Sequence, residues 1–276
     1  MTQDGDWRTT FRPDIPSAAR VYDYLLGGKD NYPADRALAE SMIAQLPNVQ
    51  LAVRWNRAFL HRVVRYLIRE AGVRQIVDIG AGLPTVGNTH EIARDADPEA
   101  RVVYVDHDPV VLAHARSMLH GVPNTAIIEH DLLEPDEILA DPILRRLIDV
   151  GEPTAFLFLS ILHFVPDEAD PARLIATLLD PFPAGSHVAI SHATPDTVPQ
   201  VNDVERVFDE ATEQAHVRSR SAVMKLVSGL EVVEPGLTWP PEWRPDPGDE
   251  VPANAAESYY CVVVARKRGL PGAAGG

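Results

Sequence analysis

Cysteine is almost absent from this 276-residue sequence, in which Cys261 is the only one. A single cysteine excludes an intrachain disulfide framework and a metal site built from several thiolates. The longest apolar stretch, residues 154–165, is far shorter than the ~20 residues that cross a membrane. The first 14 residues are polar and lack the apolar core of a secretory signal. These absences predict a cytoplasmic protein with no membrane segment and no metal site.

Positive charge is also in short supply. Only 25 Lys and Arg oppose 40 Asp and Glu, which gives a net charge of −15, and only three of the basic residues are lysines. An acidic surface repels phosphate backbones, so no nucleic-acid partner is expected. The arginines of the segment RWNRAFLHRVVRYLIR, residues 54–69, are typical of a solvated helix face. The acidic balance suits a cationic small molecule.

Apolar periodicity divides the chain into two kinds of structure. Helices are expected first, at residues 17–26, 33–46 and 51–70. Strands then alternate with helices, and the expected strands are 75–80, 101–106, 125–129, 154–159 and 187–191. Two last strands, 230–233 and 258–265, are separated by a proline-rich loop without a helix. This order predicts an α/β fold with a doubly wound, mostly parallel, seven-stranded sheet whose last strand is antiparallel.

The segment VDIGAG, residues 77–82, predicts a ligand site at the end of the first strand. Glycines there let the backbone turn sharply and approach a ligand closely. Asp106 ends the second strand, where a carboxylate can accept hydrogen bonds from both ribose hydroxyls, and Asp131 follows the third strand, where it can meet an adenine amino group. Together with Asp78, these acids favour a nucleoside site. Any single one fits a helix N-cap equally well, and we prefer that interpretation for Asp108.

Two nucleoside cofactors suit such a sheet. A nicotinamide dinucleotide needs Gly-x-Gly-x-x-Gly so that a helix N-terminus can hold the pyrophosphate. Pro84 and Thr85 lie near the place of the third glycine, which disfavours a nicotinamide-dependent oxidoreductase. S-adenosylmethionine has no phosphate and tolerates this loop, and the antiparallel end of the sheet favours it too.

Five segments carry a resemblance to a known family: ARVYDYLLGGKDNYPADR, DIGAGLPTVGNTHEIA, VYVDHDPVVLAHAR, FLFLSILHFVPD and YYCVVVARK. The chain resembles class I S-adenosylmethionine-dependent methyltransferases. It is most similar to a bacterial S-adenosyl methyltransferase family formerly called a domain of unknown function, over about residues 11–268. The resemblance implies a Rossmann-like fold. We expect a helical cap at 1–50, a methyltransferase domain at 51–268 and a disordered tail at 269–276.

The same resemblance implies which residues bind S-adenosylmethionine. Gly80, Ala81 and Gly82 would pass under its methionine part, and Asp106 would hold the ribose. His107 would flank the adenine, whose edge Asp131 and Leu132 would bound. Ser160, in the fourth of the five segments, is included among the cofactor contacts.

Residues 19–40 are unusual because they collect three tyrosines, a Gly-Gly pair and the polar tip Lys29-Asp30-Asn31. Class I sheets leave the cofactor cleft open, and this region is the large element outside the α/β core. We expect it to cover the cleft: Lys29 would reach the cofactor's carboxylate, Asp30 its amino group, and Tyr22 or Tyr32 a ring face, with Asn31 beside them. The alternative is a helix–turn–helix whose polar tip only meets solvent.

Methyl transfer mainly requires an oriented nucleophile and a dry site. If the acceptor must lose a proton, a base helps. His163, after the fourth strand, is the first candidate and His192, after the fifth, is the second. The alternative for each is a structural histidine bound to a nearby carbonyl.

The predicted function is methyl transfer from S-adenosylmethionine to a small-molecule acceptor. A catalytically inactive S-adenosylmethionine-binding regulatory protein is the main alternative. Arg218 and Arg220 can clamp an acidic acceptor or pair with surface carboxylates. Trp239 and Trp243 can line the acceptor pocket or hold their loop in place.

Overall fold

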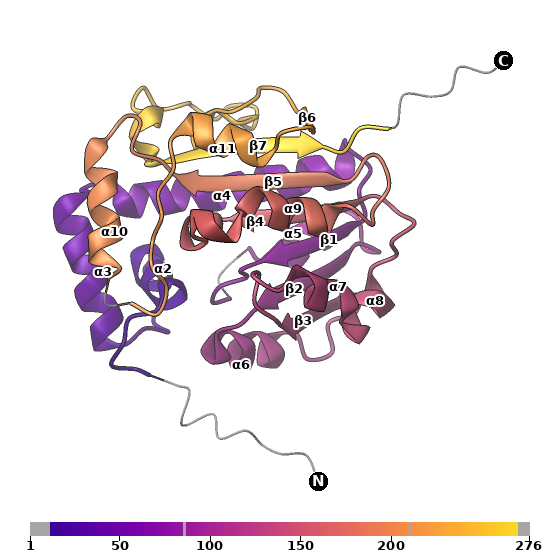
Figure 1. Ribbon diagram of the computed structural model, residues 1–276, viewed down its shortest axis with the longest axis horizontal. Helices are drawn as coiled ribbons and strands as arrows, with labels where there is room; N and C mark the ends of the chain where they lie inside the picture. Colours follow the sequence, from indigo (N-terminus) through magenta and orange to yellow (C-terminus); the bar gives the residue numbers. More distant parts are fainter. Residues whose placement is uncertain (1–11, 85–86, 210, 270–276) are drawn as a thin grey trace, which may run out of the picture.

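Figure 1 shows a central sheet with helices on both faces and a group of helices beyond one end of its strands. The computed structural model describes residues 12–84, 87–209 and 211–269. Residues 1–11 of the predicted cap, Thr85 of the glycine loop and the predicted tail beyond Gly269 lie outside the described residues. Within the described residues, no helix is long and apolar enough to cross a membrane.

The sheet has seven strands in the order β3-β2-β1-β4-β5-β7-β6. They are β1 (Gln75–Ile79), β2 (Arg101–Asp106), β3 (Thr125–Glu129), β4 (Thr154–Leu159), β5 (His187–Ala193), β6 (Glu231–Val232) and β7 (Tyr260–Arg266). Strands β1 to β5 pair in parallel, and β7 is antiparallel to both β5 and β6. The predicted fold class is confirmed, although the strand expected at 230–233 shortens to two residues.

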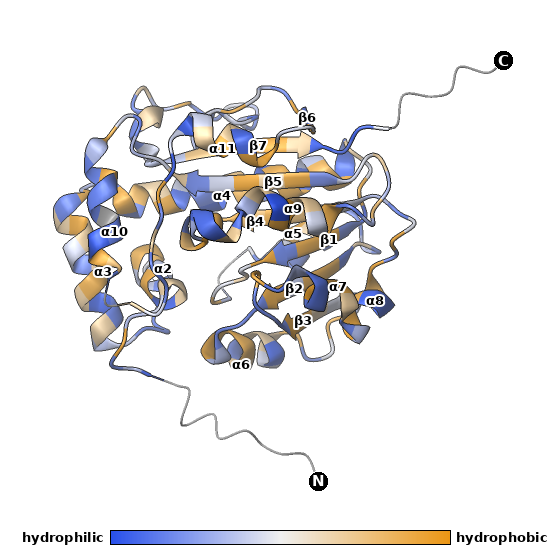
Figure 2. Ribbon diagram, viewed as in Figure 1, coloured by the Kyte–Doolittle hydropathy of each residue, from blue (hydrophilic) through white to orange (hydrophobic). Residues whose placement is uncertain are grey.

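Alternate residues of the strands point to opposite faces of the sheet and form two cores. One core packs under α4 (Val49–Arg69), α5 (Thr89–Ala96) and α6 (Pro109–Met118). The other packs under α7 (Pro135–Ala140), α8 (Pro142–Leu147), α9 (Pro171–Leu179) and α11 (Arg220–Leu226). Figure 2 shows the hydrophobic residues along β5 between these layers. The buried strands read as apolar runs because both faces are covered.

Arg62 and Trp243 show that the arginine-rich face of α4 is not wholly solvated. Arg62 is buried, and its Nε and Nη2 donate hydrogen bonds to the carbonyls of Trp243 (2.9 Å) and Pro240 (2.5 Å). The Trp243 ring packs edge-on against Phe59 and Tyr66 of the same helix. The tryptophan therefore holds its loop against α4, in agreement with the second of the two interpretations given above.

The cap has its own core, separate from the two sheet cores. It joins α2 (Ala18–Leu26), α3 (Pro33–Gln45), the start of α4 and α10 (Asp203–Val207). Figure 1 shows these elements at the end of the sheet toward which β5 points. Val201, Phe208 and Tyr259 complete the core, so residues far outside the segment 1–50 take part in the cap.

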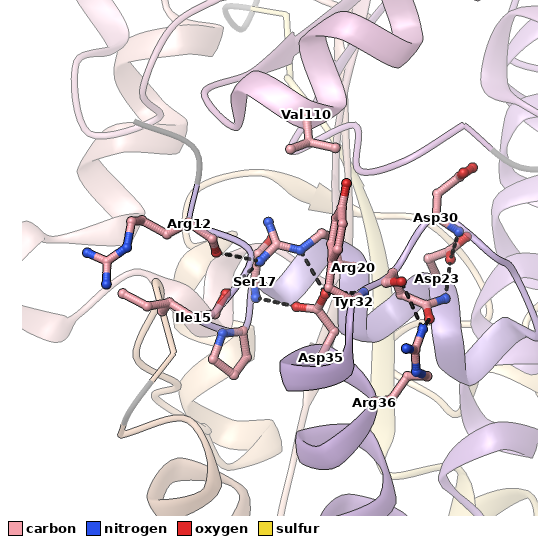
Figure 3. Close-up of polar contacts among 12 residues, drawn as sticks. Arg12, Ile15, Ser17, Arg20, Asp23, Asp30, Tyr32, Asp35, Arg36 and Val110 are labelled. Carbon is pink, nitrogen blue, oxygen red and sulfur yellow. Dashed lines mark hydrogen bonds and ion pairs between the residues drawn. The ribbon is translucent and has the colours of Figure 1, made fainter. Parts of the chain in front are cut away.

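A buried ion pair fixes the start of the cap (Figure 3). Arg20 Nε donates to Asp35 Oδ2 at 2.8 Å, and both side chains are almost fully buried. Asp35 also accepts from the amides of Ser17 (3.0 Å) and Tyr32 (2.7 Å), while Arg20 Nη2 donates to the Ile15 carbonyl at 2.6 Å. Because every charge is paired and hydrogen-bonded, the pair can be buried and holds α2 and α3 in one arrangement.

The turn between α2 and α3 folds onto Asp23. Its Oδ2 accepts hydrogen bonds from the Asp30 amide (2.9 Å) and from Asn31 Nδ2 (2.8 Å). A Cβ on Gly28 would lie 1.9 Å from Asp23 Oδ1, so a side chain at this position would displace the Asp23 carboxylate from the turn. Gly27 ends α2 with φ 87°, a left-handed conformation that glycine adopts readily. The unusual composition of this turn therefore has a local structural reason.

Candidate active site

A cavity lies beyond the carboxyl ends of β1, β2 and β4, between the sheet and the cap. The sheet contributes the turns that follow these strands, and α2 and the first half of α4 form the opposite wall. In the sheet, β1 lies between β2 and β4, and the strand order reverses on passing from one side of β1 to the other. Ligands of parallel α/β sheets bind at such a switch point.

The glycine loop, residues 80–82, is half-buried and forms part of the cavity lining. Gly80 and Gly82 have φ of 71° and 64°, which side-chain-bearing residues adopt rarely. The Gly80 amide donates to the Val105 carbonyl at 2.9 Å, and the Gly82 amide donates to Asp106 Oδ2 at 2.9 Å. A Cβ on Gly82 would meet no atom of the described residues within 4 Å, so none of them covers this position.

Asp106 is buried at the end of β2 and lines the cavity. Its Oδ1 accepts from the Asp108 amide at 2.9 Å, so each carboxylate oxygen holds one amide and keeps a further lone pair. Burial raises the pKa of Asp106 despite these two amides. Asp108 accepts from the Val110 amide at 2.7 Å through Oδ1, as expected of an N-cap. Asp106 is thus fixed in place with accepting capacity to spare.

Asp78 is a second buried carboxylate in the lining, which the sequence identified only as a strand-end acid. Thr89 Oγ1 donates to its Oδ2 at 2.6 Å. Burial raises the pKa of Asp78 to about 6, because the single hydroxyl does not offset the loss of solvent. A cation beside Asp78 would stabilise its ionised form.

Four polar side chains meet where β4 ends. Asn56 Nδ2 donates to Ser160 Oγ (2.7 Å) and to Tyr22 Oη (3.0 Å), and Tyr260 contributes its hydroxyl beside Ser160. Burial raises the pKa of both tyrosines, so both hydroxyls stay protonated. Asn56 Oδ1 is buried and has no hydrogen-bond partner among the described residues. This cluster is named the Asn56 cluster below.

The sequence missed Asn56 and Tyr260. Asn56 is 3 % exposed and occupies the apolar face of α4, three positions before Phe59. An asparagine at the core spacing of a helix was the available signal, since buried amides need partners. Tyr260 begins β7, and nothing in the sequence shows that β7 runs toward the end of β4.

His163 lines the cavity and is buried against Phe164, with 4.5 Å between ring centroids. The Ala193 amide donates to its Nδ1 at 3.5 Å, so the neutral ring carries its proton on Nε2. Burial lowers the pKa of His163 well below its usual value, and the charges of His192 and Arg218 lower it further. His163 is therefore neutral and a donor at Nε2.

His192 is fully buried and outside the cavity lining. Its Nδ1 lies 2.7 Å from the Ala193 carbonyl, and Arg218 Nη1 lies 3.2 Å from Nε2. Burial lowers the pKa of His192 to about 4. Arg218 itself pairs with Asp167 at 2.6 Å and donates to the carbonyls of Leu162 and Val165. Both ring nitrogens are occupied, which is the geometry of the structural alternative.

The structure brings together eight of the predicted site residues in the cavity lining: Tyr22, Gly80, Ala81, Gly82, Asp106, His107, Ser160 and His163. The other six lie outside the lining. Lys29 and Asp30 are exposed, Asp30 lies 3.7 Å from His114 on α6, and Asn31 is engaged by Asp23. Asp131 is exposed and accepts from the Leu133 amide at 2.9 Å, while Leu132 joins a sheet core.

Known proteins resemble this chain over almost its whole length. Its structure superposes on a methyltransferase from Thermobifida fusca YX with a TM-score of 0.87 at 38% identity, covering 92% of this chain and 96% of that one. A DUF574 family protein from Streptomyces avermitilis gives 0.86 at 39% identity, covering 93% and 100%.

A sequence relative is an S-adenosyl-L-methionine-dependent methyltransferase from Mycobacteroides abscessus, 28% identical over 192 residues. The match covers 68% of this chain and spans only 58% of the length of that relative. The profile of a family described as S-adenosyl methyltransferase matches residues 7–268. These matches and the class I fold agree with the predicted resemblance, and the chain belongs to the S-adenosyl methyltransferase family.

Proposed function

We propose that this chain transfers the methyl group of S-adenosylmethionine to a small-molecule acceptor inside the cavity described above. One observation carries the proposal: the Gly80–Gly82 loop, which is open at Gly82, the carboxylate of Asp106 and the end of β4 line a single cavity under the cap. The family to which the chain belongs supplies the cofactor.

The charges of the site suit S-adenosylmethionine better than a dinucleotide. Asp78, Asp106 and Asp108 line the cavity together with one arginine, Arg57. The carboxylates outnumber the arginine, so the lining attracts the cationic cofactor and repels a diphosphate. The N-terminus of α5, where a pyrophosphate would bind, is closed by its own capping box. Glu91 accepts there from the Asn88 amide at 2.7 Å. A nicotinamide dinucleotide would therefore have neither a free helix N-terminus for its pyrophosphate nor a lining of favourable charge.

We assign the cofactor contacts within this lining. Gly80, Ala81 and Gly82 lie under the methionine part, and Asp106 accepts from the ribose hydroxyls through its spare lone pairs. His107 flanks the adenine, and its Nε2 lies 3.8 Å from Glu213. Asp78 receives the ammonium group. Tyr22 and Ser160 lie over the reacting end, in the Asn56 cluster.

The other residues predicted to contact the cofactor lie outside the cavity lining in this structure. That Asp131 and Leu132 lie at the edge of the adenine stays a prediction. For Lys29, Asp30 and Asn31 to reach the cofactor, the turn after α2 must leave Asp23, breaking the bonds from Asp30 and Asn31. We therefore propose no role for these three residues in methyl transfer.

When bound, S-adenosylmethionine would supply a methyl group already activated by its sulfonium charge. The acceptor's lone pair would take the carbon, the carbon–sulfur electron pair would stay on sulfur, and the acceptor's proton would be released to solvent. The protein's part is to exclude water and to orient the acceptor. The Nδ1 lone pair of His163 accepts from the Ala193 amide, so the proton of the ring is on Nε2. From Nε2, His163 donates to the acceptor and fixes its position. His192 is assigned no step.

Calorimetric titration tests this function. The full chain is expected to bind S-adenosylmethionine and S-adenosylhomocysteine and to show no heat with NAD⁺. Binding of NAD⁺ alone would overturn the assignment. A pool of small acceptors then separates an enzyme from the inactive regulatory alternative, since only the enzyme releases S-adenosylhomocysteine at a rate above that without acceptor.

A further inference from the structure

The cavity does not end at the proposed cofactor site but continues into the core of the cap. This part, the cap chamber, is lined by Leu25, Met42, Phe164, Val201, Phe208 and Ala215. These residues come from α2, α3 and two later segments of the chain, and all belong to or pack on the cap core. An apolar space in the middle of a core favours an apolar occupant over water.

Charged groups of the lining are elsewhere and already engaged. Asp78, Asp106 and Asp108 stand at the strand ends, in the proposed cofactor part. Asp23 accepts from the Asp30 amide and Asn31, and Glu213 accepts from the Ala18 amide at 3.0 Å. Arg57, the arginine of the described lining, donates from Nη2 to the Gly87 carbonyl at 3.0 Å. A charged ligand in the cap chamber would have no counter-charge among its described lining residues. Burying an unpaired charge is costly, so the chamber selects uncharged molecules.

Aromatic rings give the chamber a preference for flat molecules. The rings of Phe164 and Phe208 are 5.4 Å apart between centroids and inclined by 53°. Both line the cavity, together with Tyr259. Offset and edge-on ring contacts of this spacing contribute beyond the area they bury.

The Asn56 cluster supplies one specific polar contact. Asn56 Nδ2 already donates both of its hydrogens, to Ser160 and Tyr22, so the amide can only accept a further hydrogen bond, at Oδ1. That oxygen is buried and unpaired among the described residues. An unpaired buried acceptor is costly, and a ligand that donates to it recovers that cost.

We propose that the cap chamber binds a neutral aromatic molecule whose single O–H or N–H group donates to Asn56 Oδ1. This inference rests on the proposed function, because the same molecule would be the methyl acceptor. It adds the chemical class of the acceptor, which neither the family nor the fold supplies.

The test measures binding to the full chain saturated with S-adenosylhomocysteine. The probes are phenol, 2-naphthol and 9-phenanthrol, each with a carboxylated analogue and a methyl ether of the same skeleton. At least one neutral arenol is expected to bind tenfold more tightly than both of its analogues, since the first adds charge and the second removes the donor.

Ala215→Phe places a ring in the chamber and is expected to abolish arenol binding while the affinity for S-adenosylhomocysteine changes less than twofold. Ala211→Phe, a partly exposed position of the same segment outside the lining, is the matched control. If Ala215→Phe fails to fold, the selectivity of the unmodified chain still decides. Equal or tighter binding of the carboxylates, or binding of no arenol, overturns the inference; failure of S-adenosylhomocysteine itself to bind overturns the proposed function instead.

Discussion

Ser17 Oγ donates a 2.9 Å hydrogen bond to Asp108 Oδ2 and so joins the cap to the loop after β2. The Asp108 amide in turn donates to Asp106 Oδ1 at 2.9 Å. Two hydrogen bonds therefore connect the N-cap residue of α2 with the carboxylate proposed to hold the ribose. The position of the cap and the geometry of the cofactor site are coupled through this contact.

Ser17→Ala removes this link. We expect the free energy of unfolding in urea to fall by about 1 kcal/mol, because Asp108 loses one buried partner and keeps the Val110 amide. The affinity for S-adenosylmethionine should fall a few-fold in calorimetry. Ser41→Ala is the control, since Ser41 is exposed on α3. An unchanged variant would show that the cap is held by its apolar core alone.

Asp106→Ala should weaken S-adenosylmethionine binding at least about tenfold, because hydrogen bonds to a charged group contribute about 1.5–3 kcal/mol. The glycine loop also loses its bond from Gly82, so the unfolding temperature must be recorded beside the affinity. Asp136→Ala, on the exposed side of α7, is expected to bind normally. An affinity equal to that of the unmodified chain would remove Asp106 from the site.

Asp78→Asn should stabilise the free protein in a pH-dependent way. The folded state holds the proton of Asp78 more tightly than the unfolded chain, with a folded pKa of about 6 caused mainly by burial. Ionised Asp78 therefore lowers the free energy of unfolding. This loss is absent below about pH 4, where Asp78 is protonated in both states, and complete above the folded pKa. We expect the variant to unfold at a higher temperature than the unmodified chain at pH 8 and at nearly the same temperature at pH 4.

The same substitution should weaken binding of S-adenosylmethionine at pH 8, since the neutral amide no longer attracts the ammonium group. In the unmodified chain the affinity should decline as the pH falls through about 6, where the free protein begins to protonate Asp78. A pH-independent affinity that Asp78→Asn does not alter would assign the ammonium to another partner.

His163→Ala should lower kcat about tenfold or more while the dissociation constant of S-adenosylmethionine changes less than threefold, because an orienting hydrogen bond is lost. Burial keeps the pKa of His163 well below its usual value, so the imidazole is neutral throughout the assay range. No titration of kcat with the usual histidine pKa is expected. A sigmoidal rise of kcat in that range that disappears in His163→Gln would instead identify His163 as a base.

Much of the fold and part of the site follow from local sequence. Gly80, Gly82 and Asp106 fall in one cavity because the carboxyl ends of neighbouring parallel strands necessarily meet at one edge of the sheet. Predicting the position of these three residues requires only the ends of the strands and their order in the sheet. The N-cap role of Asp108 follows in the same way from the proline after it.

The Asn56 cluster could not be predicted because it is purely tertiary. It depends on which face of α4 meets the end of β4 and on the direction of β7. The cofactor contacts predicted for the turn at 27–32 stay a prediction, and the difficulty there is the opposite one. Short polar side chains near one another bond to their own segment, and here Asp23 binds the Asp30 amide and Asn31. Composition alone does not distinguish a turn that binds itself from one that binds a ligand.

The composition of the cap core sets an order of events during synthesis. Helices α2 and α3 are made before any strand, yet Val201, Phe208 and Tyr259, which complete their core, are made after β5. Domains form from the N-terminal side as the chain leaves the ribosome, and contacts between distant segments come late. The parallel strands can assemble while the two helices still wait for their partners. The cavity proposed for methyl transfer is thus complete only when nearly the whole chain has emerged, and a stalled product would contain most of the sheet without the complete site.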